Sequence, residues 1–196
     1  MLRAYSKNNT KTGYVQGMGF VSALFLTYMD EEASFWLLNS LMDSYKMEGF
    51  YLPSFPELPR SFYKLLSLMK KFIPKIYEHL MHKNIQVSPS MYAAQWFITL
   101  FTVNFKFEIL VRVFDFFLCE GIKVVYRIGL AILKINEEKF LKAKQLEDVM
   151  GVFKEAYDNL NADELFNVAF NFGITRKQIL VNLNLKKRNM KRGMMI

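Results

Sequence analysis

The chain has 196 residues, a formal net charge of +8 and a hydrophobic content of 52%. This length predicts one domain with a sizeable core, and this hydrophobic content excludes a disordered chain. No stretch has the uninterrupted apolar length of a membrane span, and the first nine residues lack the apolar region of a signal peptide.

The cysteine content indicates a reducing compartment. Cys119 is the one cysteine of the sequence, so an internal disulfide is excluded and a cytoplasmic protein is expected. Because Cys119 follows the apolar run 116–118, the pattern favours a buried and unreactive thiol.

Helical signals follow one another along the first half of the chain. Gly17 to Tyr28 is predicted to form an apolar helix, and Asp30 is predicted to cap the start of the next one. Leu52 to Pro59 contains three prolines, which predict an irregular connector. The apolar stripe from Phe62 to Ile73 predicts another helix, and Pro74 either ends it or begins the following helix.

The second half continues the pattern. Ser88 and Pro89 predict the start of a helix that runs to about Thr102. A helix over 106–119 is expected to end at Gly121, and Ile122 to Ile135 is apolar on nearly all sides, which predicts a central buried helix. Further helices are expected at Gln145–Tyr157 and, with Asn161 as N-cap, at Asp163–Phe172, and a last one after the capping box of Thr175 and Gln178. The predicted fold class is all-α.

Three sequence blocks carry the functional signal. The first is Gly13-Tyr14-Val15-Gln16-Gly17-Met18, the second spans Tyr92 to Phe101, and the third spans Arg112 to Gly121 and continues to Lys134. The first block alone favours a glycine-rich start of a helix with Gln16 simply solvated. Together and in this order, the blocks resemble the TBC domain of Rab GTPase-activating proteins, with its G-Y-x-Q-G-M, A-x-Q-W-F-x-T-L-F and R-x-W-D-x-F-x-x-E-G motifs.

The resemblance covers residues 1–160, which are expected to form the larger, C-terminal part of a TBC domain, followed by helices and a basic tail over 161–196. In the family, the glutamine of the Y-x-Q motif acts in trans and orients the water that attacks the γ-phosphate of GTP. Gln16 is therefore the expected catalytic residue, since phosphoryl transfer depends on positioning and charge stabilisation. Tyr14 is expected to hold the loop or contact the GTPase, and the partner surface is expected to include Gly13, Gly17 and Met18.

Two further positions are interpreted from the other blocks. Gln95 is expected to contact the partner, although its position beside Trp96 favours a polar group satisfied inside the core. Arg112 and Asp115 lie three residues apart on a predicted helix, a spacing that allows them to interact. Phe114 stands where the family usually has tryptophan.

The arginine finger of the family lies in an I-x-x-D-x-x-R block upstream of the Y-x-Q block. No aspartate of this sequence is followed by an arginine three residues later. Arg3 is the nearest arginine before Gln16, but its spacing does not match, and a solvated helix position is expected. The resemblance therefore implies a domain that lacks its N-terminal portion, and a chain that activates GTP hydrolysis poorly.

Other kinds of site have weaker signals. His79 and His82 can share a helix face, but no Cys or acidic cluster accompanies them, so no metal site is predicted. No cofactor is expected, and the absence of a P-loop argues against nucleotide binding by the chain itself. Nucleic acid is not an expected partner, because no nucleic-acid motif accompanies the basic C-terminus.

Three functions remain open at this point. The first is activation of GTP-bound Rab GTPases in vesicle trafficking, with the chain in the cytoplasm and at the periphery of endomembranes. The second is a catalytically inactive TBC-like module that binds a GTPase or another protein. The third is a basic helical scaffold for membranes or nucleic acid, which depends only on the charge of the C-terminus.

Self-association is also expected. If the N-terminal portion of the domain is missing, apolar residues of the first apolar helix are left uncovered, and exposed apolar surface promotes association. The nearest candidates are Phe20, Leu24, Phe25 and Tyr28.

Overall fold

The computed structural model describes residues 1–82, 85–175 and 177–179. Every regular element in these residues is a helix, which confirms the predicted all-α class. From the N-terminus the elements are α1 (Leu2–Asn8), α2 (Met18–Leu26), α3 (Glu31–Asp43), the 3-10 helix η1 (Glu48–Phe50), α4 (Glu57–Phe72), α5 (Pro74–Leu80), α6 (Pro89–Tyr92), α7 (Ala94–Ile98), α8 (Phe107–Glu120), α9 (Lys123–Ile135), α10 (Glu137–Lys142), α11 (Leu146–Asp158) and α12 (Ala162–Asn171).

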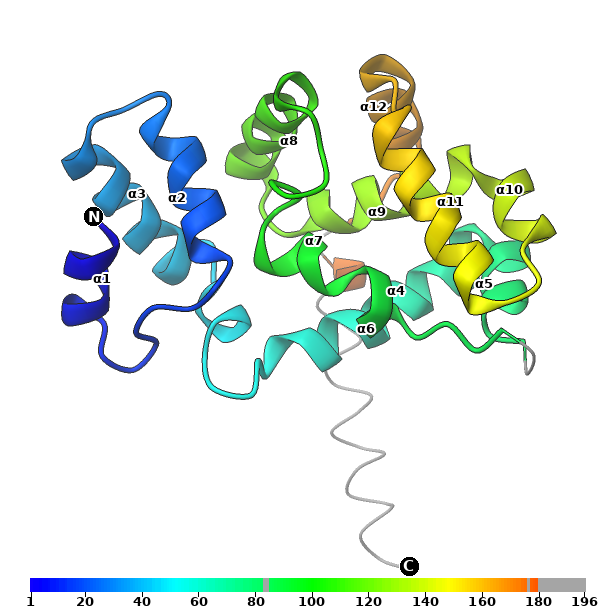
Figure 1. Cartoon of the computed structure of the whole chain (residues 1–196), viewed down its shortest axis with the longest axis horizontal. Helices are drawn as coiled ribbons and strands as arrows, with labels where there is room; N and C mark the ends of the chain where they lie inside the picture. The colour runs from blue at the N-terminus through cyan, green and yellow to red at the C-terminus, as the bar shows by residue number, and fades with distance from the viewer. Residues whose placement is uncertain (83–84, 176, 180–196) are drawn as a thin grey trace, which may run out of the picture.

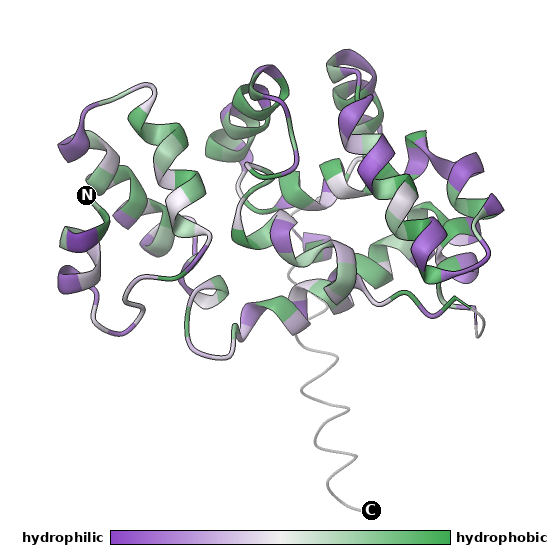
Figure 2. Cartoon of the chain, viewed as in Figure 1, coloured by the Kyte–Doolittle hydropathy of each residue, from purple (hydrophilic) through white to green (hydrophobic). Residues whose placement is uncertain are grey.

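The helices form an elongated assembly, and their buried side chains make one connected core (Figure 1). The first three helices pack on one another at one end of the molecule, and α5, α10 and α11 lie together at the other end (Figure 1). Helix α9 lies between them and packs against α7, α8, α10 and α12. Figure 2 shows that hydrophobic residues predominate on α2 and α9, whereas hydrophilic residues alternate with them along α11.

Helix α9 is the centre of the core, as its sequence predicts. Nine of its thirteen residues are buried. The ring of Trp96 packs against Gly129, where an added Cβ would come within 2.6 Å of the indole. The indole nitrogen of Trp96 donates a hydrogen bond of 2.8 Å to the hydroxyl of Tyr157, which ties α7 to α11. A glycine is therefore needed in α9 because a bulky aromatic side chain occupies the space beside it.

The predicted helix boundaries are confirmed where a single side chain or backbone angle sets them. Asp30 accepts a hydrogen bond from the backbone N–H of Ala33, and Asn161 accepts one from that of Glu164. Gly121 follows α8 with a φ of 72°, a conformation that favours glycine. Pro74 occupies the first turn of α5.

The helix predicted from Pro89 to about Thr102 is wrong in its extent. The chain forms two short helices, α6 and α7, with Ala93 between them, and then leaves the helical conformation after Ile98. Leu100 and Phe101 have positive φ values of 49° and 66°, and both side chains are fully buried. The core therefore holds these two residues in a left-handed conformation that no local signal predicts.

Three smaller predictions also need correction. The connector expected to reach Pro59 ends earlier, because α4 begins at Glu57 and a proline is tolerated in the first turn of a helix. Cys119 is exposed rather than buried, because it lies on the outer face of α8. Leu24 and Phe25 are buried, so of the four expected exposed residues only Phe20 and Tyr28 are exposed.

The C-terminal predictions lie mostly outside the described residues. The capping box is present, since Gln178 accepts a hydrogen bond of 2.8 Å from the N–H of Thr175 and its own N–H lies 3.4 Å from the Thr175 hydroxyl. The rest of the last helix and the basic cluster over 186–192 are not in the described part. Helix α12 packs along α9, and the division of the chain at residue 160 stays a prediction.

Candidate functional site

The block that contains Gln16 forms an ordered loop between α1 and α2. Asn9 organises the start of the loop, because its side-chain oxygen accepts from the N–H of Thr12 at 3.2 Å and its carbonyl accepts from the N–H of Gly13 at 2.8 Å. Its amide also donates to the hydroxyl of Tyr5, which is fully buried. Gly13 has a φ of 64°, so glycine suits this turn. The loop is thus fixed to the core at its N-terminal side.

At its C-terminal side the loop is fixed by Gly17. Gly17 has a φ of 116°, and an added Cβ would lie 2.5 Å from Cγ2 of Ile98. The carbonyl of Ile98 in turn accepts a hydrogen bond of 2.5 Å from the buried hydroxyl of Tyr51. The backbone at residue 17 therefore packs directly on the second sequence block, and the fold joins two of the three blocks.

Gln16 is presented outward from this fixed loop. Its side chain is exposed and makes no hydrogen bond to another described residue. An amide group can both donate and accept hydrogen bonds, so the free amide of Gln16 can bind a water molecule or a group of a partner. Tyr14 is also exposed, at 57%, and its hydroxyl would lie 3.6 Å from a Cβ added at Gly19. Its side chain therefore extends toward the first turn of α2.

Two residues of the predicted partner surface lie inside the protein instead. Met18 is fully buried and begins α2. Gly17 is buried against Ile98. The side chain of Met18 belongs to the core and supports the loop from inside, and its contact with a partner stays a prediction. Together, these two residues hold the loop from the inside while Tyr14 and Gln16 face outward.

The position of Gln95 beside Trp96 suggests a polar group inside the core, but the structure places Gln95 elsewhere. Its side chain is exposed on α7, whereas Trp96 is fully buried, so Gln95 is not a polar group satisfied inside the core. The two side chains project in different directions because consecutive residues of a helix lie about 100° apart. Gln95 is therefore accessible to a partner, three residues before the point where Gly17 packs on Ile98.

The structure adds a feature that sequence patterns do not reveal. Tyr14 lines a surface cleft together with residues of α1, among them Arg3 and Lys7. Both basic residues are exposed, as expected for Arg3. Their four-residue spacing places them on one face of α1. This spacing is the only sequence signal that could have indicated the cleft. The exposed side of the loop is thus bordered by positive charge.

The third block builds structure away from this loop. Arg112 does not pair with Asp115, as its spacing allows, but forms an ion pair of 2.8 Å with Asp163 and stacks over the ring of Phe166 at 4.4 Å. Phe114 is buried and meets Phe25 edge to face at 5.9 Å. The block therefore links α8 to α12 and α2.

Three ionisable groups that pack beside the loop, Glu48, Tyr5 and Tyr51, are paired or neutral. The hydrogen bond from Lys11 lowers the pKa of Glu48, whose carboxylate accepts it at 2.9 Å. Burial raises the pKa of the Tyr5 and Tyr51 phenols, so both stay protonated at neutral pH. Neither tyrosine is poised to act as an acid or base, and the candidate chemistry at this site is that of the neutral amide of Gln16.

The described residues contain no group of three or more His, Cys, Asp or Glu side chains arranged to hold a metal ion. His79, one of the two histidines considered for such a role, makes a hydrogen bond of 2.8 Å between its Nε2 and the carbonyl of Ala143. None of the helices in the described part of the chain combines the length and apolar character needed to cross a membrane.

Comparison with known proteins identifies the family. The model of the Rab-GTPase-TBC domain matches residues 1–141. A crystal structure of the Chlamydomonas flagellar RabGAP TBC domain superposes with a TM-score of 0.76 and 31% sequence identity, over 87% of this chain and 57% of that one. The chain belongs to the Rab-GTPase-TBC domain family.

Curated relatives agree with this assignment. The chain is 30% identical to the human ecotropic viral integration site 5 protein homolog, over 91% of this chain and 22% of that protein. It is 33% identical to the Rab GTPase-activating protein eat-17 of Caenorhabditis elegans, over 91% and 20%, and 36% identical to the GTPase-activating protein GYP5 of Saccharomyces cerevisiae, over 85% and 18%. The chain spans about a fifth of the length of these relatives.

Proposed function

We propose that the chain acts on a GTP-bound Rab GTPase and that Gln16 orients, in trans, the water that attacks the γ-phosphate. The observation that carries the proposal is the exposed amide of Gln16, which makes no hydrogen bond to another described residue and projects from a loop fixed at both sides. A fixed loop keeps the amide in one position, and positioning is the main contribution that a protein makes to phosphoryl transfer.

The other exposed residues of the site supply binding in this proposal. Tyr14 and Gln95 offer an aromatic face and an amide to the GTPase, and the backbone at Gly13, which is half-buried with open space beside it, is also within a partner's reach. Arg3 and Lys7 border the cleft at Tyr14, where positive charge favours an acidic partner surface. Gly17 and Met18 contribute indirectly, because they fix the loop from within the core.

A second candidate function is docking of a GTPase or another protein without acceleration of hydrolysis. The observation that favours it is the absence of an I-x-x-D-x-x-R block from these 196 residues. An arginine finger contributes about 10³–10⁵ in rate, and a glutamine alone does not replace the positive charge that it brings to the transition state. We therefore propose that residues 1–196 bind a Rab but activate it poorly by themselves.

A Rab partner implies a cellular setting, which is part of the proposal. The chain would regulate vesicle trafficking in the cytoplasm, at the periphery of endomembranes. Lys186, Lys187, Arg188, Lys191 and Arg192 would add attraction to an anionic membrane surface, and the exposed apolar residues would support self-association.

One experiment separates the two candidate functions. Residues 1–196 are incubated with a panel of GTP-loaded Rab GTPases, and both binding and single-turnover hydrolysis are measured. We expect binding to at least one Rab, with acceleration far below that of a domain that contains the arginine block. Full acceleration by residues 1–196 alone would contradict the proposal that an essential arginine is missing from them. A chain that binds no Rab in the panel would contradict the first function and would leave, of the second, only docking of another protein.

A further inference from the structure

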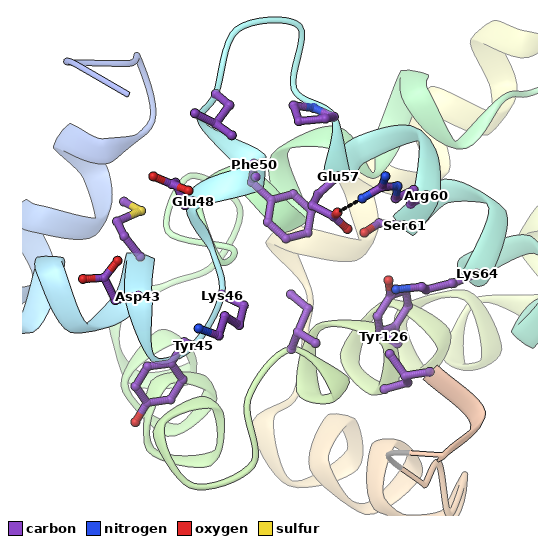
Figure 3. A pocket seen from close by; sticks show the side chains of 16 residues that line it. Asp43, Tyr45, Lys46, Glu48, Phe50, Glu57, Arg60, Ser61, Lys64 and Tyr126 are labelled. Atoms are coloured by element: carbon purple, nitrogen blue, oxygen red, sulfur yellow. Dashed lines mark hydrogen bonds and ion pairs between the residues drawn. The ribbon is translucent and has the colours of Figure 1, made fainter. Parts of the chain in front are cut away.

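A second cleft, with a volume of about 470 Å³, lies between the end of α3, η1, the first turns of α4 and the start of α9, and its lining includes no residue of the Gln16 loop (Figure 3). This volume lies within the range of small-molecule pockets. Much of its wall is apolar, and the apolar lining consists of Met42, Phe50, Leu52, Pro56, Ile122 and Ile179.

Lys64 is the unusual residue of this cleft. Its side chain is only 8% exposed, yet it forms no ion pair or hydrogen bond with any described residue. Lysine is almost never buried without a partner. The acidic residue two turns away on α4, Glu57, is already bound to Arg60 (Figure 3). The residues outside the described part, 83–84, 176 and 180–196, include no Asp or Glu, so none of them offers an acidic side chain to Lys64.

Tyr126 provides a second polar group without a partner. It lines the same cleft from α9, it is 1% exposed, and its hydroxyl has no hydrogen bond to a described residue. Burial raises the pKa of the Tyr126 phenol, and the nearby Ser61 opposes this shift, but the two hydroxyls do not meet the geometry of a hydrogen bond. An unsatisfied buried polar group is destabilising, so a bound group that accepts from this hydroxyl would be favoured.

The charges of the lining restrict the kind of ligand. The lining carries Lys46, Arg60 and Lys64 against Asp43, Glu48 and Glu57, but Glu48 is already bound to Lys11 and Glu57 to Arg60. With Lys11 included, four cations face three acids, so the excess is one positive charge, and Lys64 is the buried cation of the cleft. A phosphate dianion would bring more charge than the cleft can neutralise, whereas one carboxylate matches it.

We propose that this cleft binds a small-molecule carboxylate attached to an apolar body, with the carboxylate on Lys64 and Tyr126 and the apolar body against the lining of Phe50, Leu52 and Ile122. Burial lowers the pKa of Lys64, Arg60 adds to this effect and Glu57 opposes it. A carboxylate beside the ammonium of Lys64 stabilises its charged form. The bound ligand would thus supply the charge-assisted hydrogen bond that this buried lysine lacks among the described residues.

Titration calorimetry with three matched probes tests the proposal on residues 1–196. Heptanoate carries the predicted carboxylate, heptanamide has the same shape without the charge, and heptyl phosphate carries a larger charge. We expect heptanoate to bind at least about tenfold more tightly than heptanamide, because hydrogen bonds to charged groups are the stronger ones. Equal binding of acid and amide, or tighter binding of heptyl phosphate than of heptanoate, overturns the proposal.

Variants connect the binding to this cleft. Lys64→Met keeps a long apolar side chain and removes the ammonium, and Tyr126→Phe removes only the hydroxyl. Each is expected to weaken heptanoate binding, by about tenfold or more for Lys64→Met. Lys70→Met, at an exposed position of the same helix, is the matched control and should bind as the wild type does. Retained affinity in Lys64→Met, or in a folded Tyr126→Phe if the first variant does not fold, overturns the proposal.

Discussion

Gly17 lies directly against Ile98: a Cβ added at residue 17 would come within 2.5 Å of Cγ2 of Ile98, at a φ of 116° that side chains rarely adopt. This contact connects the loop that carries Gln16 to the C-terminal end of α7. Since Ile98 is itself fixed by the hydrogen bond from Tyr51 to its carbonyl, the position of the loop depends on the core and not on the loop alone.

Gly17→Ala is therefore expected to destabilise the protein by about 2–4 kcal/mol, from backbone strain and from overlap with Ile98. Chemical denaturation measures the change. Gly151→Ala is the matched control, because Gly151 lies within α11 with open space around it, and alanine is expected to stabilise a helix interior by about 0.5–1 kcal/mol. Equal effects of the two substitutions would show that the contact at Ile98 is not tight.

The hydrogen bond between Trp96 and Tyr157 gives a second prediction. Tyr157→Phe keeps the ring but leaves the indole N–H of a fully buried tryptophan without its partner. We expect a loss of about 1–3 kcal/mol in the free energy of unfolding, measured by urea denaturation at neutral pH. An unchanged stability would contradict the importance of this bond for holding α11 on α7.

The same tyrosine predicts a dependence on alkaline pH. Burial raises the pKa of the Tyr157 phenol to about 12, whereas tyrosines of the unfolded chain titrate near 10. The folded state therefore holds this proton more tightly, and the stability that it contributes is complete below about pH 10 and is lost as the pH rises toward 12. Burial also raises the pKa of Tyr51, Tyr92 and Tyr126.

Unfolding curves between pH 9 and 12 test this linkage. The free energy of unfolding should fall with pH in the wild type, and the fall should be less steep in Tyr157→Phe, which has one such phenol fewer. A slope that is the same in both proteins would show that Tyr157 titrates alike in the folded and unfolded states.

Local signals predict the ends of helices well because one side chain or one backbone angle decides them. Asp30, Asn161 and Gly121 stand at the boundaries that their chemistry indicates. The end of α7 after Ile98 has no such signal. It follows from the core, where Phe101 stacks on Phe105 at 4.8 Å and on Trp96 at 5.7 Å. These contacts between elements override the helical preference of the segment.

The candidate site shows the same division. The sequence block indicates Gln16 and Tyr14, and the structure places both on the surface. It does not indicate that Met18 faces the core or that Gln95 faces outward, because the side of a helix that is buried depends on what packs against it. A sequence motif indicates the residues of a site, whereas the packing of the helices determines which of these residues are exposed to a partner.

Exposed aromatic residues predict weak self-association. Tyr28, which follows α2, and Phe107, the first residue of α8, are 61% and 47% exposed, and their rings stack at a centroid distance of 6.0 Å. We expect light scattering to show association that grows with protein concentration and that is reduced in the Tyr28→Ser, Phe107→Ser double variant. A wild-type protein that stays monomeric at high concentration and binds no apolar-surface dye would contradict this expectation.

The role of Gln16 is tested most directly by single-turnover GTP hydrolysis on a cognate Rab, with a version of the domain that also contains the arginine block. Gln16→Ala should slow the stimulated hydrolysis by about 10²-fold or more and leave the folding stability within about 0.5 kcal/mol of the wild type, because the side chain has no intramolecular hydrogen bond among the described residues. Asn167→Ala, which removes an exposed amide from α12, is the control and should retain full activity. Unchanged hydrolysis in Gln16→Ala would contradict the assignment of this glutamine.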